Sequence, residues 1–311
     1  MELDRSTQPA RAALLPDDFS FSQSSLQAFA DCARRFWLAY VQRLPWPAIE
    51  AEPVQDHELL MRLGAQFHLL VQRAEIGLDL GLLTRSLPAP LDAWFAAYQS
   101  YRPSDLPSGR IEVERVLTVP LALSAPTEGD ITAPGRVYRL AAKYDLIAAD
   151  EEGRVVIVDW KTGRRRPEPS TLRQRLQTLV YLYVLVEAAP ALGWGEIAPE
   201  QVEMRYWFTA APNQPIIIRY DQAQHAENGR KLKALVQRIL AGSAIEDFPL
   251  APDTEANRAR LCRYCAYRSR CNRGVLPGHV DDLEELEYIE EHSPDSISLH
   301  FSLDDVAEIA F

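Results

Sequence analysis

The order of the predicted elements indicates an α/β or α+β domain in which helices cover a mixed β-sheet. Three observations support this prediction. Residues 22–101 repeat apolar side chains at helical spacing, residues 111–160 change to the two-residue alternation of strands, and residues 171–240 return to helices around two further strands. This order is typical of domains that build one sheet between layers of helices.

The first predicted helix begins near Ser22, where Ser24-x-x-Gln27 resembles a capping box, and it ends before Pro45. Two more helices are expected over about 56–80 and over 91–101. Strands are expected over 111–119, 137–149 and 154–160, with the turn signal DEEG between the last two. An apolar helix through Val186 opens at Thr171-x-x-Gln174, and strands over 201–209 and 215–220 and a helix over 222–240 follow.

We expect a single domain over residues 19–280, because no Gly, Ser or Pro-rich linker separates the helical start from the sheet. Residues 1–18 are expected to be a flexible N-terminus, and residues 124–135 (SAPTEGDITAPG) a loop between strands. Residues 281–311 form an acidic C-terminal tail, with a candidate helix over 281–292.

The net charge of −11 does not exclude a nucleic-acid partner, because the charge is unevenly distributed. The tail holds eleven Asp and Glu and no Lys or Arg, and the rest of the chain holds 33 acidic and 33 basic residues. Basic clusters lie at 164–166 and 258–273. No apolar run is long enough for a membrane span or a signal peptide. The sequence therefore predicts a soluble, cytoplasmic protein with no membrane partner.

The strand over Val155–Val158 runs directly into Asp159, Trp160 and Lys161. A hairpin turn centred on Glu152 would place Asp159 opposite Asp145, because opposed residue numbers then add to 304. Alternation puts Asp159 and Lys161 on one face of the strand and Trp160 on the other.

Two carboxylates this close repel each other unless a cation lies between them, and oxygen ligands of this kind bind Mg²⁺ or Mn²⁺. A neighbouring lysine could stabilise charge on a phosphate oxygen or orient water. The group therefore indicates metal-assisted phosphodiester hydrolysis. The alternative is a surface Asp–Lys pair at the end of a strand.

Further residues extend the pattern. Asp145, Asp159-x-Lys161-Thr162-Gly163 and Gln177-x3-Tyr181, preceded by Gly64-x3-His68, resemble the PD-(D/E)XK nucleases, and more narrowly the RecB-type nuclease domains and the exonucleases of CRISPR adaptation. The resemblance implies a restriction-endonuclease-like core in which His68, Asp145 and Asp159 bind metal. Asp145, Asp159 and Lys161 would be catalytic.

The resemblance further implies that Gln177 and Tyr181 support the substrate. They lie four residues apart, and so share a helix face. Arg164 and Arg165 follow the catalytic strand and are candidate phosphate contacts. The family usually has glycine at the position of Ala142, which predicts a slightly tighter backbone. The alternatives are an ordinary helix histidine at 68 and ordinary packing at 177 and 181.

The chain contains four cysteines: Cys32, Cys262, Cys265 and Cys271. The C-x2-C pair with a third cysteine close behind indicates metal ligation, and a disulfide framework is not expected in a cytosolic chain of this length. The arrangement resembles the AddB-type and CRISPR-associated nucleases, in which it implies a structural 4Fe–4S cluster. A Zn²⁺ site with four cysteines is the alternative.

The sequence therefore predicts a Mg²⁺- or Mn²⁺-dependent deoxyribonuclease that acts in DNA repair or related processing. The resemblance implies an exonuclease on single strands or duplex ends. The chain has no G-x-x-x-x-G-K-[ST] motif, so a separate helicase is a possible partner. The alternative is a DNA-binding scaffold subunit that has the nuclease fold and little catalysis.

Overall fold

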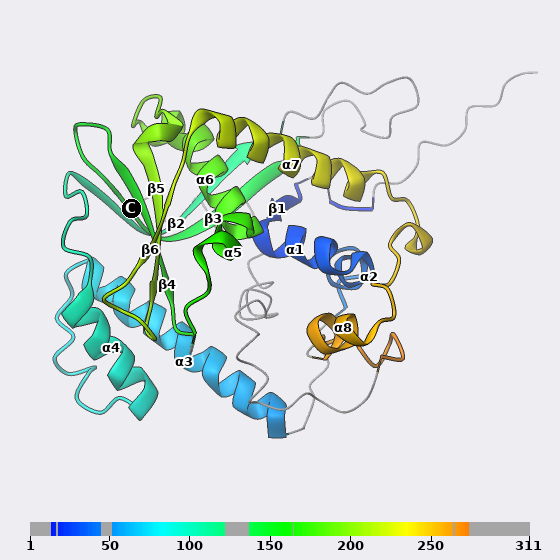
Figure 1. The fold of residues 1–311 in the computed structure, drawn as a ribbon, viewed down its shortest axis with the longest axis horizontal. Helices are drawn as coiled ribbons and strands as arrows, with labels where there is room; N and C mark the ends of the chain where they lie inside the picture. The colour runs from blue at the N-terminus through cyan, green and yellow to red at the C-terminus, as the bar shows by residue number, and fades with distance from the viewer. Residues whose placement is uncertain are drawn as a thin grey trace, which may run out of the picture.

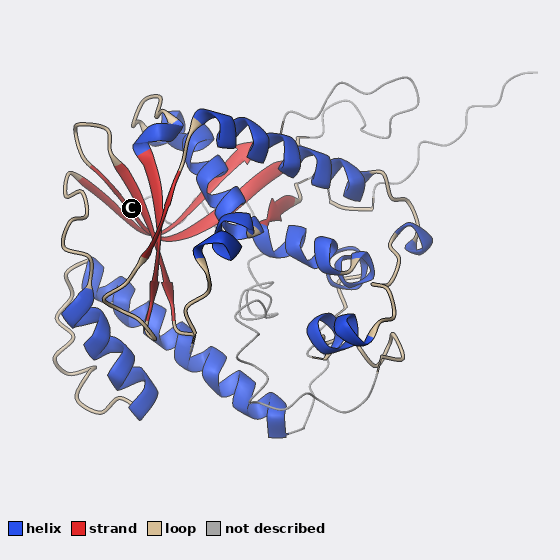
Figure 2. Cartoon of the chain, in the orientation of Figure 1, coloured by secondary structure: helices blue, strands red, loops and turns tan. Residues whose placement is uncertain are grey.

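The computed structural model describes residues 14–16, 18–44, 52–121, 137–163, 165–263 and 265–273, and for residues 52–58 it describes the backbone alone. Helices cover both faces of a central mixed sheet, which confirms the predicted architecture (Figures 1 and 2). The predicted loop over 124–135 and the predicted helix over 281–292 lie outside the described residues. The predicted division into domains is not tested, although Leu15 packs into the core.

The strands of the sheet are β1 (Ser20–Ser22), β2 (Arg110–Pro120), β3 (Arg139–Ala149), β4 (Val155–Lys161), β5 (Val202–Phe208) and β6 (Ile216–Arg219). The helices are α1 (Gln23–Asp31), α2 (Ala33–Phe36), α3 (Glu52–Glu75), α4 (Ala89–Tyr101), α5 (Pro169–Gln174), α6 (Leu176–Ala188), α7 (Gln222–Leu240) and α8 (Glu255–Asn257). π-helical turns continue α2 over Trp37–Val41 and α8 over Arg258–Cys262.

Strand β3 organises the sheet because three other strands pair with it. Strand β2 runs antiparallel along one edge of β3. The other edge is shared, with β1 parallel to residues 139–141 and β4 antiparallel to residues 146–149. Residues 142–145 therefore lie between these two partners, where β4 leaves β3. Strand β4 continues beside β5, and β6 completes the sheet.

A hydrophobic cluster covers each face of the sheet. The larger cluster packs α1, α6 and α7 against β3, β4 and β5, with residues such as Tyr144 and Ile157 fully buried. The smaller cluster packs α3 and α4 against the opposite face, around Trp160 and Trp207. Figure 1 shows α3 and α4 together at the lower left, away from α6 and α7. The core therefore holds the ends of β3 and β4 between two rigid layers.

The first predicted helix is wrong in two details. The capping box joins Ser22 and Ser25, whose hydroxyl groups accept from each other's backbone N–H at 3.2 and 2.9 Å, and does not involve Ser24. The helix also breaks at Cys32, whose backbone is extended at φ −159° and ψ 106°. Periodicity continues across the break, so the sequence pattern did not reveal it.

The predicted helix from Thr171 to Val186 is also divided. Arg175 has extended backbone at ψ 140°, and it separates α5 from α6. The carbonyl of Leu172 accepts from the backbone N–H of Arg175 at 3.1 Å and from the hydroxyl of Thr178 at 2.6 Å, so both contacts hold the break in place. Within the described residues, no helix has both the length and the apolarity that crossing a bilayer requires.

Candidate active site

The site is built where β3 and β4 separate. The pairs from Leu146↔Val158 to Ala149↔Val155 have the predicted register, since their residue numbers add to 304. Pairing ends just before Asp145 and Asp159. There the backbone N–H of Trp160 donates to Oδ2 of Asp145 at 2.9 Å. The carboxylate of Asp145 therefore fills the opening and lies against the residue that follows Asp159.

The face alternation of β3 shifts by one residue at Asp145. Tyr144 packs in the larger cluster, and so does Ile147, although an unbroken strand would place them on opposite faces. The shift turns Asp145 toward α3, where its Oδ1 lies 3.4 Å from Nδ1 of His68. Ala142, where the family usually has glycine, is buried within β3.

The Gly64-x3-His68 spacing has a steric basis in the structure. A Cβ atom on Gly64 would lie 3.3 Å from Oγ1 of Thr162, at the end of β4. A glycine one helical turn before the histidine therefore lets α3 approach the strand closely. This close approach brings His68 to the opening between β3 and β4.

Glu114 is a site residue that the sequence analysis missed. It lies on β2 opposite Asp145, between the pairs Val113↔Leu146 and Arg115↔Tyr144. The ligand atoms of His68, Glu114 and Asp145 all lie within 4.8 Å of one another. The register of β2 against β3 would have identified Glu114, but the sequence of the long connection over 121–138 does not show where its turn is centred.

Electrostatics couple these three groups. Burial opposes the charged form of His68, but the Asp145 carboxylate outweighs it and raises the pKa of the imidazole. Burial also works against ionised Asp145, yet His68 and the Trp160 N–H hold the pKa of that carboxyl below its usual value. Burial and the charge of Asp145 raise the pKa of Glu114. Lys143 of β3 also pairs with Glu114, so the group contains positive as well as negative side chains.

Asp159 is buried and is held by two other side chains. Its Oδ1 accepts a hydrogen bond from Nε2 of Gln177 at 2.9 Å, and its Oδ2 lies 3.1 Å from Nζ of Lys161. Trp160 points the other way and packs edge-on against Tyr98 and Trp207, as alternation requires. Among the described residues, His68, Glu114 and Asp145 form a group whose ligand atoms lie close enough to share one cation. Asp159 is not a member of this group.

Gln177 and Tyr181 lie on α6 beside the carboxylates. Gln177 is buried, and its Oε1 accepts from the hydroxyl of Tyr206 at 3.4 Å, so its amide is oriented from both ends. The Tyr181 ring lies 4.9 Å from that of Tyr144. Burial, followed by the charges of Asp159 and Asp145, raises the pKa of Tyr181 well above its usual value. Both residues therefore contribute to the surroundings of Asp159.

Of the two arginines that we predict to contact phosphate after β4, one lies within the described residues. Arg164 lies outside the described residues, and Arg165 is exposed. The neighbouring Arg166 donates through Nε to the carbonyl of Gln214 at 2.9 Å. Arg165 therefore lies on the segment that leaves the active-site strand, and its contact with phosphate stays a prediction.

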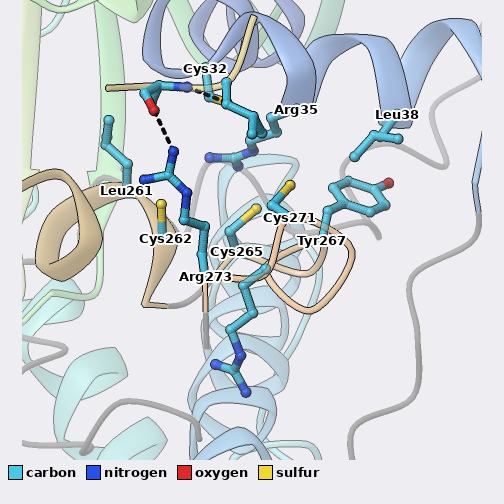
Figure 3. Close-up of a pocket in the computed structure, with 12 residues that line it drawn as sticks. Cys32, Arg35, Leu38, Leu261, Cys262, Cys265, Tyr267, Cys271 and Arg273 are labelled. Atoms are coloured by element: carbon cyan, nitrogen blue, oxygen red, sulfur yellow. Dashed lines mark hydrogen bonds between the residues drawn. The ribbon is translucent and has the colours of Figure 1, made fainter. Parts of the chain in front are cut away.

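The four cysteines line one pocket between the N-terminal helices and the C-terminal segment (Figure 3). All four thiols are free. Cys32 reaches the pocket from the break after α1, and its sulfur accepts from the backbone N–H of Ala251 at 3.4 Å. Arg34 ties the two segments together by donating to the carbonyls of Phe248 and Ile245.

The thiols lie close enough together to influence one another's ionisation. Burial, and then the neighbouring sulfurs, raise the pKa of Cys271 to about 11. Burial also raises the pKa of Cys262 and of Cys265. Apolar side chains such as Leu38 and Leu261 complete the lining of the pocket. Four convergent soft ligands fit either an iron–sulfur cluster or zinc.

Comparisons with known proteins place the chain among nucleases. A model of the PD-(D/E)XK nuclease superfamily matches residues 20–272, which agrees with the predicted restriction-endonuclease-like fold. The crystal structure of SSO0001 matches at 12% identity over 83% of this chain and 87% of that chain, with a TM-score of 0.34. A candidate exonuclease from Eubacterium rectale matches at 14% identity over 84% and 91%, with a TM-score of 0.41. A search of curated proteins found no match.

Proposed function

Because this chain belongs to the PD-(D/E)XK nuclease superfamily, we propose that it is a metal-dependent DNA exonuclease that acts on single strands or duplex ends. The observation that carries the proposal is the contact between Asp159 and Lys161 beside Asp145, at the opening between β3 and β4. The preference for exonuclease activity rests on the resemblance to RecB-type domains and to the exonucleases of CRISPR adaptation.

The side chains have separate roles in this proposal. His68, Asp145 and Asp159 would hold Mg²⁺ or Mn²⁺, which supplies Lewis-acid stabilisation of the phosphodiester when bound. Lys161 places an ammonium 3.1 Å from Asp159, where it can stabilise developing negative charge on a phosphate oxygen. Gln177 fixes the Asp159 carboxylate, and Tyr181 lies beside both acids.

We further propose that Cys32, Cys262, Cys265 and Cys271 hold a structural 4Fe–4S cluster, as in the AddB-like subset. Their common pocket and the N–H donor to Cys32 support this proposal, because hydrogen bonds to sulfur accompany such clusters. Zinc is the alternative, because it accepts the same four thiolates. The bound cluster or zinc ion would join the N-terminal helices to the C-terminal segment.

Positive charge after β4 supports a DNA substrate. Arg164 and Arg165 would contact phosphates as the strand leaves the site. A separate helicase is a partner consistent with a nuclease that carries no motor motif of its own. DNA repair is the setting that we propose for this activity.

A cleavage assay tests the nuclease. Single-stranded and duplex DNA, labelled at each end in turn, is incubated with the protein and Mg²⁺, Mn²⁺ or a chelator. We expect cleavage from an end that the chelator stops and that Asp159→Asn and Lys161→Ala abolish. Lys231→Ala, which removes an exposed charge on α7, should cut like the wild type. A wild type that binds DNA but cuts none would favour the scaffold subunit.

A second experiment identifies the metal of the cysteine pocket. Protein purified without oxygen should be brown and contain iron and sulfide if the cluster is present. A colourless preparation with one zinc ion per chain would establish the zinc alternative.

A further inference from the structure

The hydroxyl group of Tyr206 lies behind the active site, one strand away from Asp159. Strand β5 runs parallel to β4 with Tyr206 directly beside Asp159, so the two side chains share one face of the sheet. Helix α6 covers this face. Tyr206 is fully buried, and its ring packs against that of Phe208 with 6.3 Å between the ring centres. A buried hydroxyl group that is held in this way makes the polar groups around it rigid.

Two polar side chains of α6 contact this hydroxyl group. Oγ1 of Thr178 lies 2.7 Å from it, and Oε1 of Gln177 lies 3.4 Å from it. Gln177 in turn donates from Nε2 to Asp159 at 2.9 Å. An ionised carboxylate only accepts hydrogen bonds, so the NH2 end of the amide faces Asp159 and the oxygen end faces Tyr206. The amide therefore connects the hydroxyl group to the carboxylate.

The partners of the two hydroxyl groups assign their protons. Thr178 donates its single proton to the carbonyl of Leu172 at 2.6 Å, so its oxygen is an acceptor for Tyr206. The proton of Tyr206 therefore lies between two acceptors, the nearer oxygen of Thr178 and the more distant oxygen of Gln177. Thr178 holds the hydroxyl group in place, and Gln177 shares its proton.

On the premise of the proposed nuclease function, we infer that Tyr206 is a positioning residue for Asp159 and acts through the amide of Gln177. Rotation of the amide would carry Nε2 away from Asp159, and the hydroxyl group opposes this rotation because it binds the other end of the amide. The alternative is that Tyr206 and Thr178 only satisfy each other inside the core. The 3.4 Å contact would then have no effect on the active site.

A double-mutant cycle on the full chain separates the two explanations. We expect Tyr206→Phe to lower the rate constant of DNA cleavage about two- to tenfold, the effect of one hydrogen bond, and to leave the KM for DNA unchanged. In a Gln177→Ala background Tyr206→Phe should have no further effect, because the connection to Asp159 is already broken. A loss of rate that persists in this background would show that Tyr206 acts through packing alone, and would overturn the inference.

Thr178 supplies a second cycle with the opposite expectation. Thr178→Ala removes the nearer acceptor and leaves the proton of Tyr206 to Gln177. Tyr206→Phe should therefore lower the rate constant at least as much in this background as in the wild type. Thr178→Ser keeps the hydroxyl group and is the control, because it should leave the effect of Tyr206→Phe unchanged. If Tyr206→Phe has no effect once Thr178 is replaced by alanine, the two hydroxyl groups serve only each other and the inference is wrong.

Tyr220→Phe is the matched control for the loss of a buried tyrosine hydroxyl group. Tyr220 is buried in the same hydrophobic cluster, and its hydroxyl group lies 3.0 Å from Nδ1 of His225. Tyr206→Phe and Tyr220→Phe should both lower the free energy of unfolding, as measured by urea unfolding, because each removes a buried hydrogen bond. Only Tyr206→Phe should slow cleavage. Equal losses of rate in the two variants would reduce the effect to stability and contradict the inference.

A Mn²⁺ titration without DNA, followed by electron paramagnetic resonance, tests the same connection without cleavage. Tyr206→Phe should weaken Mn²⁺ binding by a similar factor, and should not weaken it further in the Gln177→Ala background. A wild type that cuts no DNA but shows this dependence would refute the nuclease and keep the inference. A wild type that cuts DNA while Tyr206→Phe equals it in both measurements would refute the inference alone. A wild type that neither binds Mn²⁺ nor cuts DNA would refute both.

Discussion

The side-chain amide of Gln177 donates from Nε2 to Oδ1 of Asp159 at 2.9 Å, and both side chains are buried. The Tyr206 hydroxyl donates to the other end of the same amide at 3.4 Å. This chain of contacts fixes the plane of the Asp159 carboxylate before any substrate arrives. Gln177 is therefore a positioning residue for the proposed catalytic acid.

We predict that Gln177→Ala lowers the rate constant of DNA cleavage about 10- to 100-fold, because supports of metal-site ligands typically contribute that much. The KM for DNA should change little. Gln174→Ala, an exposed glutamine on α5, is the matched control and should act like the wild type. A raised KM with an unchanged rate constant would instead assign Gln177 to substrate binding.

The second prediction concerns the contact between α3 and the end of β4. Replacing glycine by alanine inside a helix gains about 1 kcal/mol of stability where there is room. At Gly64 the new Cβ would lie 3.3 Å from Oγ1 of Thr162, so part of that gain should be lost to crowding. Gly64→Ala should therefore stabilise the protein more in a Thr162→Ala background than in the wild type.

Urea unfolding of the wild type, Gly64→Ala, Thr162→Ala and the double variant measures this coupling. Thr162→Ser keeps a γ-oxygen and is the control, because it should leave the effect of Gly64→Ala as in the wild type. Equal effects of Gly64→Ala in all three backgrounds would show that α3 does not depend on a close approach here.

The sequence predicted the register at the active site because the β3–β4 hairpin has a short turn. A turn centred on Glu152 determines every pair up to Leu146↔Val158. The turn alone does not show that β3 and β4 separate beyond this pair. The separation depends on the pairing of β4 with β5, a strand about 40 residues further along the chain. Local pattern therefore placed Asp145 and Asp159 near each other but did not give their orientation.

The features that were missed depend on tertiary contacts. The breaks at Cys32 and Arg175 interrupt continuous apolar periodicity, and the second is stabilised by the hydroxyl of Thr178. Glu114 reaches the site through a left-handed backbone that no residue preference indicates for glutamate. Periodicity describes which face a residue takes in a regular element, and these residues lie where the elements are irregular.

A third prediction concerns acid stability. The guanidinium of the buried Arg205 binds Asp105 through two hydrogen bonds of 2.6 and 2.8 Å, and it holds the pKa of that carboxyl at about 2. The pKa of an aspartate in the unfolded chain is about 3.9. The pair therefore stabilises the protein above that pH, and its contribution is lost as the pH falls toward 2.

The expected effect is small, because the side chain of Asp105 is 65% exposed and solvent screens the pair. The difference in unfolding free energy between the wild type and Asp105→Asn should shrink between pH 5 and pH 3, as measured by urea unfolding at each pH. If acid releases a metal bound by the cysteines, it does so in both proteins. That effect therefore cancels in the difference between their unfolding free energies. A difference that stays constant over this interval would contradict the assignment.

The last prediction concerns the joining of the two ends of the domain by the cysteines. Cys32 lies after α1, and the other three cysteines follow α8. A link that closes so long a loop restricts the unfolded chain, by about 5 kcal/mol in the chain-entropy treatment of a cross-link. Cys32→Ser should therefore release the bound iron or zinc and lower the melting temperature by several degrees.

Cys271→Ser should have the same effect, because either change breaks the same set of four ligands. Ser269→Ala, in the same segment as Cys271, should melt like the wild type. If Cys32→Ser keeps the metal content and the melting temperature of the wild type, Cys32 is not a ligand and the two ends are joined by packing alone.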